Sequence, residues 1–218
     1  MKKTTWERHA LRTLLVAACV MGSVVLTGCE DEEDAPFDYG DNDANLFVAM
    51  GDSITLGIEA HSGTPYPQHL ASMLGKTVLN YGEDGAFSYQ GAAIVGHVLA
   101  NTKTGHLLIM YGANDLIWGR DLAEIVGDLR TMVQAAKGNK TMAVVATLPA
   151  MTRHAMNFFD ATLALNTQIR QMAAEENIRV AEVEPLFLGR EEELLPDGLH
   201  PNNEGNRLVA QAFYNVLR

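Results

Sequence analysis

The chain alternates short apolar runs with longer segments in which apolar residues recur every three or four positions. Nearly continuous apolar runs predict buried strands over Leu46–Met50, Thr77–Asn80, His106–Tyr111, Met142–Leu148 and Ile178–Val183. Helical spacing predicts helices over Tyr66–Leu74, Gln90–Ala100, Leu122–Ala136, Thr162–Glu176 and Asn203–Leu217. This alternation predicts an α/β fold in three α/β/α layers, with a flavodoxin-like five-stranded parallel sheet of strand order 2-1-3-4-5.

Residues 1–28 have the pattern of a targeting segment. Two lysines and two arginines lie within the first 12 residues, and they precede an apolar stretch of 13 residues, Leu14–Leu26. A stretch of this length is short for a membrane span and typical of a signal peptide. It ends at Leu26-Thr27-Gly28-Cys29, which resembles a bacterial lipobox, where cleavage precedes a cysteine that carries the lipid. We expect a lipoprotein signal peptide with Cys29 as the lipidation site; the alternative is a plain secretory signal followed by an incidental cysteine.

The segment after the signal is strongly acidic. Residues 30–45 hold eight carboxylates and no lysine or arginine. Such a segment cannot bury enough apolar surface to fold. We expect the lipidated cysteine and this spacer, residues 29–45, to form a disordered tether between a membrane anchor and one folded domain over 46–218. The expected location is the bacterial cell envelope, on the periplasmic or outer face.

Charge and cysteine content limit the function classes. Of the formal net charge of −11, −6 remains in residues 46–218 once the basic signal and the acidic spacer are set apart. A mildly acidic domain argues against nucleic acid as a partner. Cys19 would leave with the signal, so the mature chain would keep Cys29 alone and form no intrachain disulfide. The chain has no H-E-x-x-H motif, and we expect no metal and no cofactor.

Ser53 stands where a reactive group is expected. It follows the first predicted strand, and in open α/β sheets the reactive groups lie beyond the carboxyl ends of the strands. The turn is not the G-x-S-x-G elbow of α/β-hydrolases, because Thr55 occupies the position of the second glycine. A serine nucleophile needs a general base and donors for an oxyanion, and the rest of the chain offers candidates for both.

Candidates for the base lie in the segment Asp197-Gly198-Leu199-His200-Pro201. An acid three residues before a histidine can accept a hydrogen bond from the ring Nδ1–H, which leaves Nε2 free to take a proton from a serine. The alternative is a helix start, with Pro201 in the first turn and Asp197 as a surface turn residue. The two interpretations are compatible.

Candidates for oxyanion donors follow two other predicted strands. Asn114 could direct a side-chain N–H at the oxyanion, and Asp115 could order the loop or cap the next segment. After the second strand, the turn holds Gly82 and Gly85, where backbone N–H groups could approach a substrate closely.

Four sequence blocks, spread over nearly all of 46–218, resemble in content and order those of the SGNH hydrolase superfamily, also called GDSL esterases and lipases. The blocks are Gly51-Asp52-Ser53, the turn ending at Gly85, Gly112-x-Asn114-Asp115 and Asp197-x-x-His200. The resemblance implies that Ser53 is the nucleophile, His200 the base and Asp197 its orienting acid. It also implies an oxyanion hole formed by the N–H groups of Ser53 and Gly85 and by the Asn114 amide.

The second block matches the family least closely. Glu83 and Asp84 stand where small residues are commoner, so Gly82 is an alternative to Gly85 as the oxyanion glycine.

The resemblance implies a serine esterase that hydrolyses carboxylic esters through an acyl-enzyme. The expected substrates are small molecules: short- to medium-chain acyl, aryl or lysophospholipid-type esters. Two alternatives stay open. One is a carbohydrate or peptidoglycan O-acetylesterase or acetyltransferase of the cell envelope, and the other is a non-catalytic binding lipoprotein that keeps the fold.

Several side chains beside the motifs are candidates for substrate contacts; the alternative for each is a place in the core. The candidates are Asp52, Ile54, Phe87, Leu116 and Trp118. The other histidines after the signal lack a nearby aspartate partner in the sequence, and we expect them to be surface or packing residues. They are His61, His69, His97, His106 and His154.

Overall fold

The computed structural model describes residues 37–58, 63–152 and 158–218. The predicted signal peptide and the lipidation site Cys29 lie outside the described residues. Within the described part of the chain, every helix is too short or too polar to cross a bilayer.

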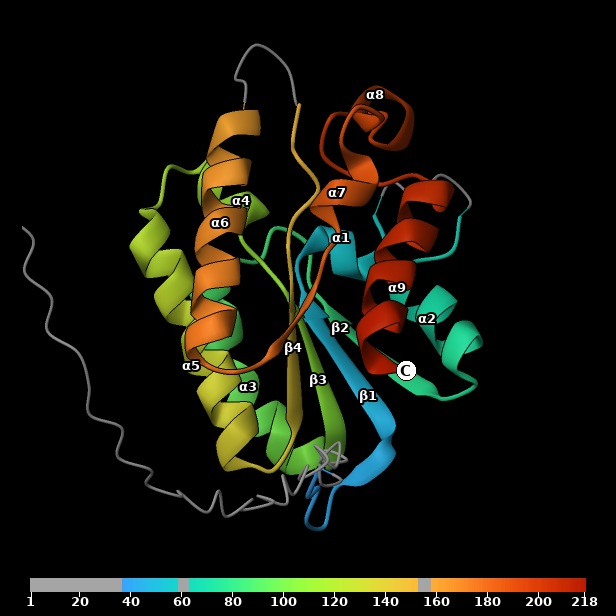
Figure 1. Cartoon of the computed structure of the whole chain (residues 1–218), viewed down its shortest axis with the longest axis vertical. Helices are drawn as coiled ribbons and strands as arrows, with labels where there is room; N and C mark the ends of the chain where they lie inside the picture. Colours follow the sequence, from blue (N-terminus) through green and yellow to red (C-terminus); the bar gives the residue numbers. More distant parts are fainter. Residues whose placement is uncertain (1–36, 59–62, 153–157) are drawn as a thin grey trace, which may run out of the picture. The chain divides into compact units, whose positions relative to one another are not determined.

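A five-stranded parallel sheet in the order β2-β1-β3-β4-β5 forms the centre of the domain (Figure 1). Its strands are β1 (Asp43–Gly51), β2 (Thr77–Gly82), β3 (Thr104–Met110), β4 (Met142–Ala146) and β5 (Arg179–Ala181). The α/β class and the strand order 2-1-3-4-5 expected from the sequence are therefore confirmed. A parallel sheet needs helical crossovers, which explains the helices on both of its faces.

Two groups of helices cover the sheet, and Figure 1 shows α3, α5 and α6 on one side and α2 and α9 on the other. These helices are α2 (Tyr66–Leu74), α3 (Ser88–Thr102), α5 (Leu122–Gly138), α6 (Phe159–Glu175) and α9 (Asn203–Leu217). All five were expected from helical spacing, and the differences at their ends are at most three residues. Their apolar faces point to the sheet because a helix and a sheet each bury one face against the other.

Four short helices have no counterpart in the sequence prediction. They are α1 (Ser53–Leu56), α4 (Ala113–Ile117), α7 (Glu184–Phe187) and α8 (Glu191–Leu194). A single turn is too short to show a hydrophobic period, so spacing cannot reveal it. Two of them carry candidate site residues, because α1 follows β1 and α4 follows β3 directly at the carboxyl edge of the sheet.

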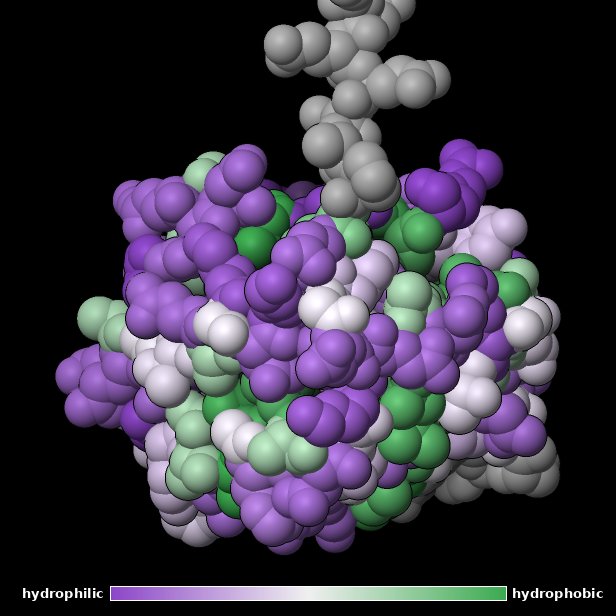
Figure 2. Space-filling view, turned by 90° about the horizontal axis from the view of Figure 1, so that it is seen from below, coloured by the Kyte–Doolittle hydropathy of each residue, from purple (hydrophilic) through white to green (hydrophobic). Residues whose placement is uncertain are grey.

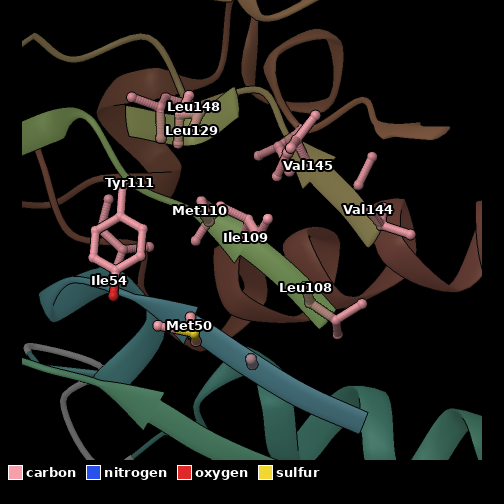
Figure 3. Packing of buried hydrophobic residues seen from close by; sticks show 14 of the residues in the cluster. Met50, Ile54, Leu108, Ile109, Met110, Tyr111, Leu129, Val144, Val145 and Leu148 are labelled. Atoms are coloured by element: carbon pink, nitrogen blue, oxygen red, sulfur yellow. The ribbon is translucent and has the colours of Figure 1, made fainter. Parts of the chain in front are cut away.

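The core lies between the central strands and the helix layers. Every residue of β3 is buried, and its second half, residues 107–110, is continuously apolar. Figure 3 shows Met50 of β1, Leu108 of β3 and Val144 of β4 among the packed side chains of this cluster.

The predicted tether is wrong for its last part. The residues before β1 contact the domain: Asp38 forms an ion pair with Lys140 at 2.6 Å, and the Tyr39 hydroxyl lies 3.0 Å from Nε2 of His106. The Tyr39 ring also packs against the His106 ring, with centroids 5.2 Å apart. The acidic composition hid these specific contacts, and the described fold begins by residue 37 rather than 46.

The two ends of the sheet differ in character. Figure 2 views the molecule from below, toward the amino ends of the strands, and hydrophilic side chains cover most of that surface with apolar ones in small separate groups. The short helices and turns with candidate chemistry lie at the opposite, carboxyl end (Figure 1). This placement follows the general rule for open parallel sheets.

Candidate active site

The strand register brings three candidate turns together. Gly51, the last residue of β1, pairs with Gly82 of β2 on one side and with Met110 of β3 on the other. The turns after these strands carry Ser53, Gly85 and Asn114. Adjacent strands in a sheet lie about 4.8 Å apart, so the three turns start as neighbours.

The turn that carries Ser53 is fixed by its own backbone and by Gly51. The Asp52 carboxylate accepts a hydrogen bond of 2.9 Å from the Ile54 N–H and so caps α1, whose first residue is Ser53. A Cβ on Gly51 would lie 1.9 Å from the Thr55 hydroxyl and 2.6 Å from the Met110 carbonyl oxygen. Only glycine fits there, and the tight turn holds the serine at the strand end.

His200 joins Ser53 to Asp197. Its Nε2 lies 2.9 Å from the Ser53 Oγ, and its Nδ1 lies 2.8 Å from the Asp197 Oδ2. The other carboxylate oxygen of Asp197, Oδ1, accepts hydrogen bonds from the backbone N–H groups of Leu199 at 2.9 Å and His200 at 2.7 Å. Partial burial acts to raise the pKa of Asp197, but these bonds outweigh it and lower the pKa below its usual value, which favours the ionised form.

The helix-start interpretation of this segment is also correct in part. Helix α9 begins at Asn203, and the Asn202 side chain caps it by accepting the Gly205 N–H at 2.9 Å. Pro201 therefore precedes the cap instead of occupying the first turn. Asp197 is not a simple surface turn residue, because its carboxylate is occupied by His200 and its neighbours.

Asn114 lies beside the turn after β2. Its Nδ2 donates a hydrogen bond of 3.0 Å to the Ala86 carbonyl oxygen, which fixes the orientation of the amide. An amide nitrogen carries two hydrogens, so the second remains available for a ligand. Gly85, next to Ala86, has φ +71°, and its position has open space around it.

The structure favours Gly85 over Gly82 as a donor to a ligand. The Gly82 N–H is already bonded to the Asn80 Oδ1 at 2.9 Å. A Cβ on Gly82 would lie 2.1 Å from the backbone nitrogen of Leu56, so this glycine is needed for the close approach of β2 to α1. Gly85 has no such packing role.

Three of the five predicted substrate contacts are almost fully buried. Asp52 and Ile54 are 1% and 2% exposed, and Leu116 is 7% exposed. Asp52 serves as the cap of α1, while Ile54 and Leu116 belong to the hydrophobic core (Figure 3 shows Ile54). Phe87 is half-buried and Trp118 is 76% exposed, so these two are the accessible members of the five.

The buried carboxyl of Asp52 is unusual in its protonation. Burial raises its pKa to about 7, and the nearby charges of Asp115 and Asp84 act in the same direction. Its Oδ1 caps α1, whereas its Oδ2 is buried with no hydrogen-bond partner in the described structure. At neutral pH this group is therefore neutral in a large fraction of molecules.

The sequence did not reveal a polar cluster behind Asn114. Asp115 is fully buried and accepts the Ser88 N–H at 3.0 Å and a bond from Arg120 Nη1 at 2.5 Å. The same Nη1 lies 2.9 Å from the Asp128 carboxylate. The expectation that Asp115 orders the loop fits this geometry. Arg120 and Asp128 carried no motif, and only the packing of α3, α4 and α5 brings them here.

The other described histidines have packing or surface contacts. His106 stacks on Phe47 with ring centroids 4.1 Å apart, and burial lowers its pKa to about 4. His69 and His97 contact Asn203 and Asn101, respectively. His61 and His154 lie outside the described residues. Among residues the structure describes, no group of three or more His, Cys, Asp or Glu could hold a metal ion.

One family model and several solved structures are similar to this chain. Residues 49–208 match the model of the GDSL-like lipase/acylhydrolase family. A member of the lipolytic protein G-D-S-L family from Veillonella parvula DSM 2008 is 24% identical, with a TM-score of 0.67 over 78% of this chain and 97% of that one. An acetylxylan esterase from Geobacillus stearothermophilus is 21% identical, with a TM-score of 0.69 over 81% and 95%. A GDSL-like lipase from Bacteroides thetaiotaomicron VPI-5482 is 19% identical, with a TM-score of 0.69 over 79% and 87%.

Comparison with curated proteins gives no match. The three solved structures share the fold of this chain at low identity, so the family assignment depends on the family model.

Proposed function

This chain belongs to the GDSL-like lipase/acylhydrolase family, and we propose that it is a serine esterase whose catalytic triad is Ser53, His200 and Asp197. The observation that carries the proposal is the unbroken line of hydrogen bonds from Ser53 Oγ to His200 Nε2 at 2.9 Å and from His200 Nδ1 to Asp197 at 2.8 Å. This is the geometry that a general base and its orienting acid need.

The reaction starts when Ser53 Oγ attacks the ester carbonyl and His200 Nε2 takes the serine proton. The ionised Asp197 stabilises the imidazolium that forms and holds its tautomer. The bond to the leaving alcohol breaks as His200 returns the proton to that oxygen. Water then attacks the acyl-enzyme with His200 again as base, and the acid leaves.

The tetrahedral oxyanion is bound by three donors: the N–H groups of Ser53 and Gly85 and the free hydrogen of the Asn114 amide. Ser53 is the first residue of α1, and the first N–H groups of a helix have no partner within the helix. The bond from Asn114 to Ala86 supports this assignment, because it holds the amide next to Gly85. Donors fixed before the reaction stabilise the oxyanion without reorganisation.

We propose short acyl esters as the substrates. Ile54, Leu116 and Met151 are almost fully buried and offer little surface to an acyl chain. A long acyl chain needs a continuous apolar surface, and of the five predicted contacts only Phe87 and Trp118 offer accessible apolar area.

A second candidate is an O-acetylesterase that acts on envelope carbohydrate. The exposed Trp118 and a cavity of about 760 Å³ beside Asp197 favour it. Arg190, Glu192 and Glu193 are among the residues that line this cavity, and such polar groups suit the hydroxyls of a carbohydrate. The structural likeness to an acetylxylan esterase agrees with this candidate.

We further propose that the protein is anchored in the bacterial cell envelope through a lipid on Cys29. The lipobox-like Leu26-Thr27-Gly28-Cys29 after an apolar stretch supports this. Incorporation of labelled palmitate into the wild-type protein in bacterial cells, and its loss in Cys29→Ser, would support the anchor. Labelling that persists in Cys29→Ser, or is absent from both, would contradict it.

The function is tested by hydrolysis of p-nitrophenyl esters from acetyl to dodecanoyl by the full-length protein in detergent, with Ser53→Ala in parallel. We expect activity that is highest on acetyl or butyryl esters and lost in Ser53→Ala. Activity that survives in Ser53→Ala would reject the triad. Acetylated xylo-oligosaccharides hydrolysed faster than p-nitrophenyl acetate would favour the carbohydrate candidate, and a folded protein inactive on every ester would favour a transferase or binding protein.

A further inference from the structure

Hydrogen bonds in both directions join the turn after β2 to the turn after β3. Asn114 donates from Nδ2 to the Ala86 carbonyl oxygen at 3.0 Å, and the next residue, Asp115, accepts the Ser88 N–H at 3.0 Å. The Ser88 hydroxyl adds a bond of 2.8 Å to the same carboxylate. One turn carries Gly85 and the other carries Asn114, so these bonds set the spacing between the two turns.

Arg120 completes this connection from the loop after α4. Its Nη1 lies 2.5 Å from Asp115, 2.9 Å from Asp128 and 3.0 Å from the Ser88 hydroxyl. Its backbone N–H donates to the Asp115 carbonyl oxygen at 2.9 Å, and its guanidinium lies 5.2 Å from the centre of the Tyr89 ring. Asp115 is 0% exposed, and removing the charged partner of a buried carboxylate is strongly destabilising.

We propose that Arg120, held by Asp128, is a positioning residue for the oxyanion hole, which fixes the distance between the Gly85 N–H and the Asn114 amide. It touches no reacting atom and acts through Asp115. The inference rests on the proposed function, because it takes Asn114 and Gly85 as the oxyanion donors. Small displacements of such donors have large effects on rate, because their hydrogen bonds stabilise the oxyanion only when the donors lie at the right distance from it.

The first test is Arg120→Met, which keeps the length of the side chain and removes its charge and its hydrogen bonds. We expect kcat on p-nitrophenyl acetate to fall about 10- to 100-fold with KM changed less than about 2-fold, because transition-state bonds are lost and ground-state binding is kept. Arg120→Lys keeps the charge without the fork of donors and should recover part of the loss.

The second test asks whether the effect passes through Asn114. Asn114→Ala alone should lower kcat about 10²- to 10³-fold, as expected for one oxyanion donor. In that background Arg120→Met should lower kcat by less than about 3-fold, because the donor that it positions is already absent. An equal loss in both backgrounds would overturn the proposal.

Arg130→Met is the matched control for the loss of an ion pair. Arg130 lies on α5 and pairs with Glu175 at 2.5 Å and Glu176 at 2.8 Å, away from the candidate site. We expect this variant to lower the melting temperature without lowering kcat. A fall in kcat of similar size in both arginine variants would mean that Arg120 supports the fold alone, and would overturn the proposal.

Amide hydrogen exchange gives a readout that needs no turnover. We expect faster exchange in residues 85–88 and 113–118 of Arg120→Met and no change there in Arg130→Met. Unchanged exchange in these segments would overturn the proposal whatever the activity. If instead the exchange result appears while Ser53→Ala remains fully active, the proposed function fails and the structural link between the two turns stands.

Discussion

Asp197 binds His200 with both of its carboxylate oxygens: Oδ2 lies 2.8 Å from the ring Nδ1, and Oδ1 accepts the backbone N–H of the same histidine at 2.7 Å. A single acid therefore fixes the histidine backbone and its ring. The spacing of three residues allows this because Gly198, with φ +75°, turns the chain back between them. The ring that faces Ser53 is thus oriented before any substrate binds.

The first prediction concerns Asp197→Asn. The asparagine Oδ1 can still accept hydrogen bonds from the two backbone N–H groups, so the fold should remain. Its Nδ2 cannot accept a hydrogen bond from the His200 Nδ1–H, so the His200 tautomer with the proton on Nδ1 is no longer stabilised. We expect kcat to fall about 10²- to 10⁴-fold, measured on p-nitrophenyl acetate. Circular dichroism and the melting temperature control for folding, and a folded Asp197→Asn with wild-type kcat would remove Asp197 from the triad.

The sequence was sufficient for the sheet and for the relative places of Ser53, Gly85, Asn114 and His200. Each follows or faces the carboxyl edge of a parallel sheet, and the strand order follows from the alternation of elements. These features are local in sequence or are imposed by topology.

Contacts that depend on tertiary packing could not be predicted. Ile54 and Leu116 stand next to functional residues, yet their side chains turn into the core. The link from Arg120 to Asp128 needs α4 and α5 in place. The aromatic contact of Tyr39 was hidden in a segment whose charge indicated disorder. In each case the sequence gives the residue type, but it does not tell whether the side chain points into the core, toward another helix or to the solvent.

The second prediction separates the two glycines of the turn after β2. Gly82→Ala places a methyl group against the Leu56 backbone and should lower the free energy of unfolding by roughly 3 kcal/mol. Gly85→Ala meets no atom but must adopt φ +71°, which costs about 1 kcal/mol. If Gly85 is an oxyanion donor, this strain also displaces its N–H, and we expect kcat to fall about 10-fold. Urea unfolding and steady-state kinetics measure the two effects.

Gly75→Ala is the matched control for Gly85→Ala. Gly75 follows α2 as its C-cap with φ +64°, and it also has open space where a Cβ would be. The same backbone strain should therefore lower stability by a similar amount and leave kcat unchanged. Full activity in Gly85→Ala, with its stability lowered as in Gly75→Ala, would argue against Gly85 as a donor.

The third prediction tests whether the domain begins before residue 46. Tyr39→Phe removes the hydroxyl that pairs with Nε2 of the buried His106, so we expect a loss of about 1 kcal/mol in the free energy of unfolding. Tyr81→Phe, a change at an exposed tyrosine, should alter it by less than about 0.5 kcal/mol. Neither change should affect kcat. Equal stability of the two variants would return residues 37–42 to the predicted tether.

The last prediction concerns two buried groups with opposite effects on stability. The pKa of Asp52 is raised to about 7 in the folded state, so the unfolded chain loses this proton first and the contribution of Asp52 to stability falls as the pH rises from about 4 to 7. The pKa of His106 is lowered to about 4, so the unfolded chain binds this proton first and stability falls as the pH drops from about 6.5 to 4.

The two effects overlap between pH 4.5 and 6.5, and their slopes oppose each other. Asp52→Asn removes the slope that opposes the histidine, so stability should rise by roughly 2–3 kcal/mol more than in the wild type over this range. In His106→Phe, where a phenyl ring can keep the stacking on Phe47, the change relative to the wild type should be of similar size and opposite sign. The wild-type slope should lie between those of the two variants. Urea unfolding at pH 4.5, 5.5 and 6.5 measures all three, and variants whose slopes match the wild type would show that neither group titrates as its burial requires.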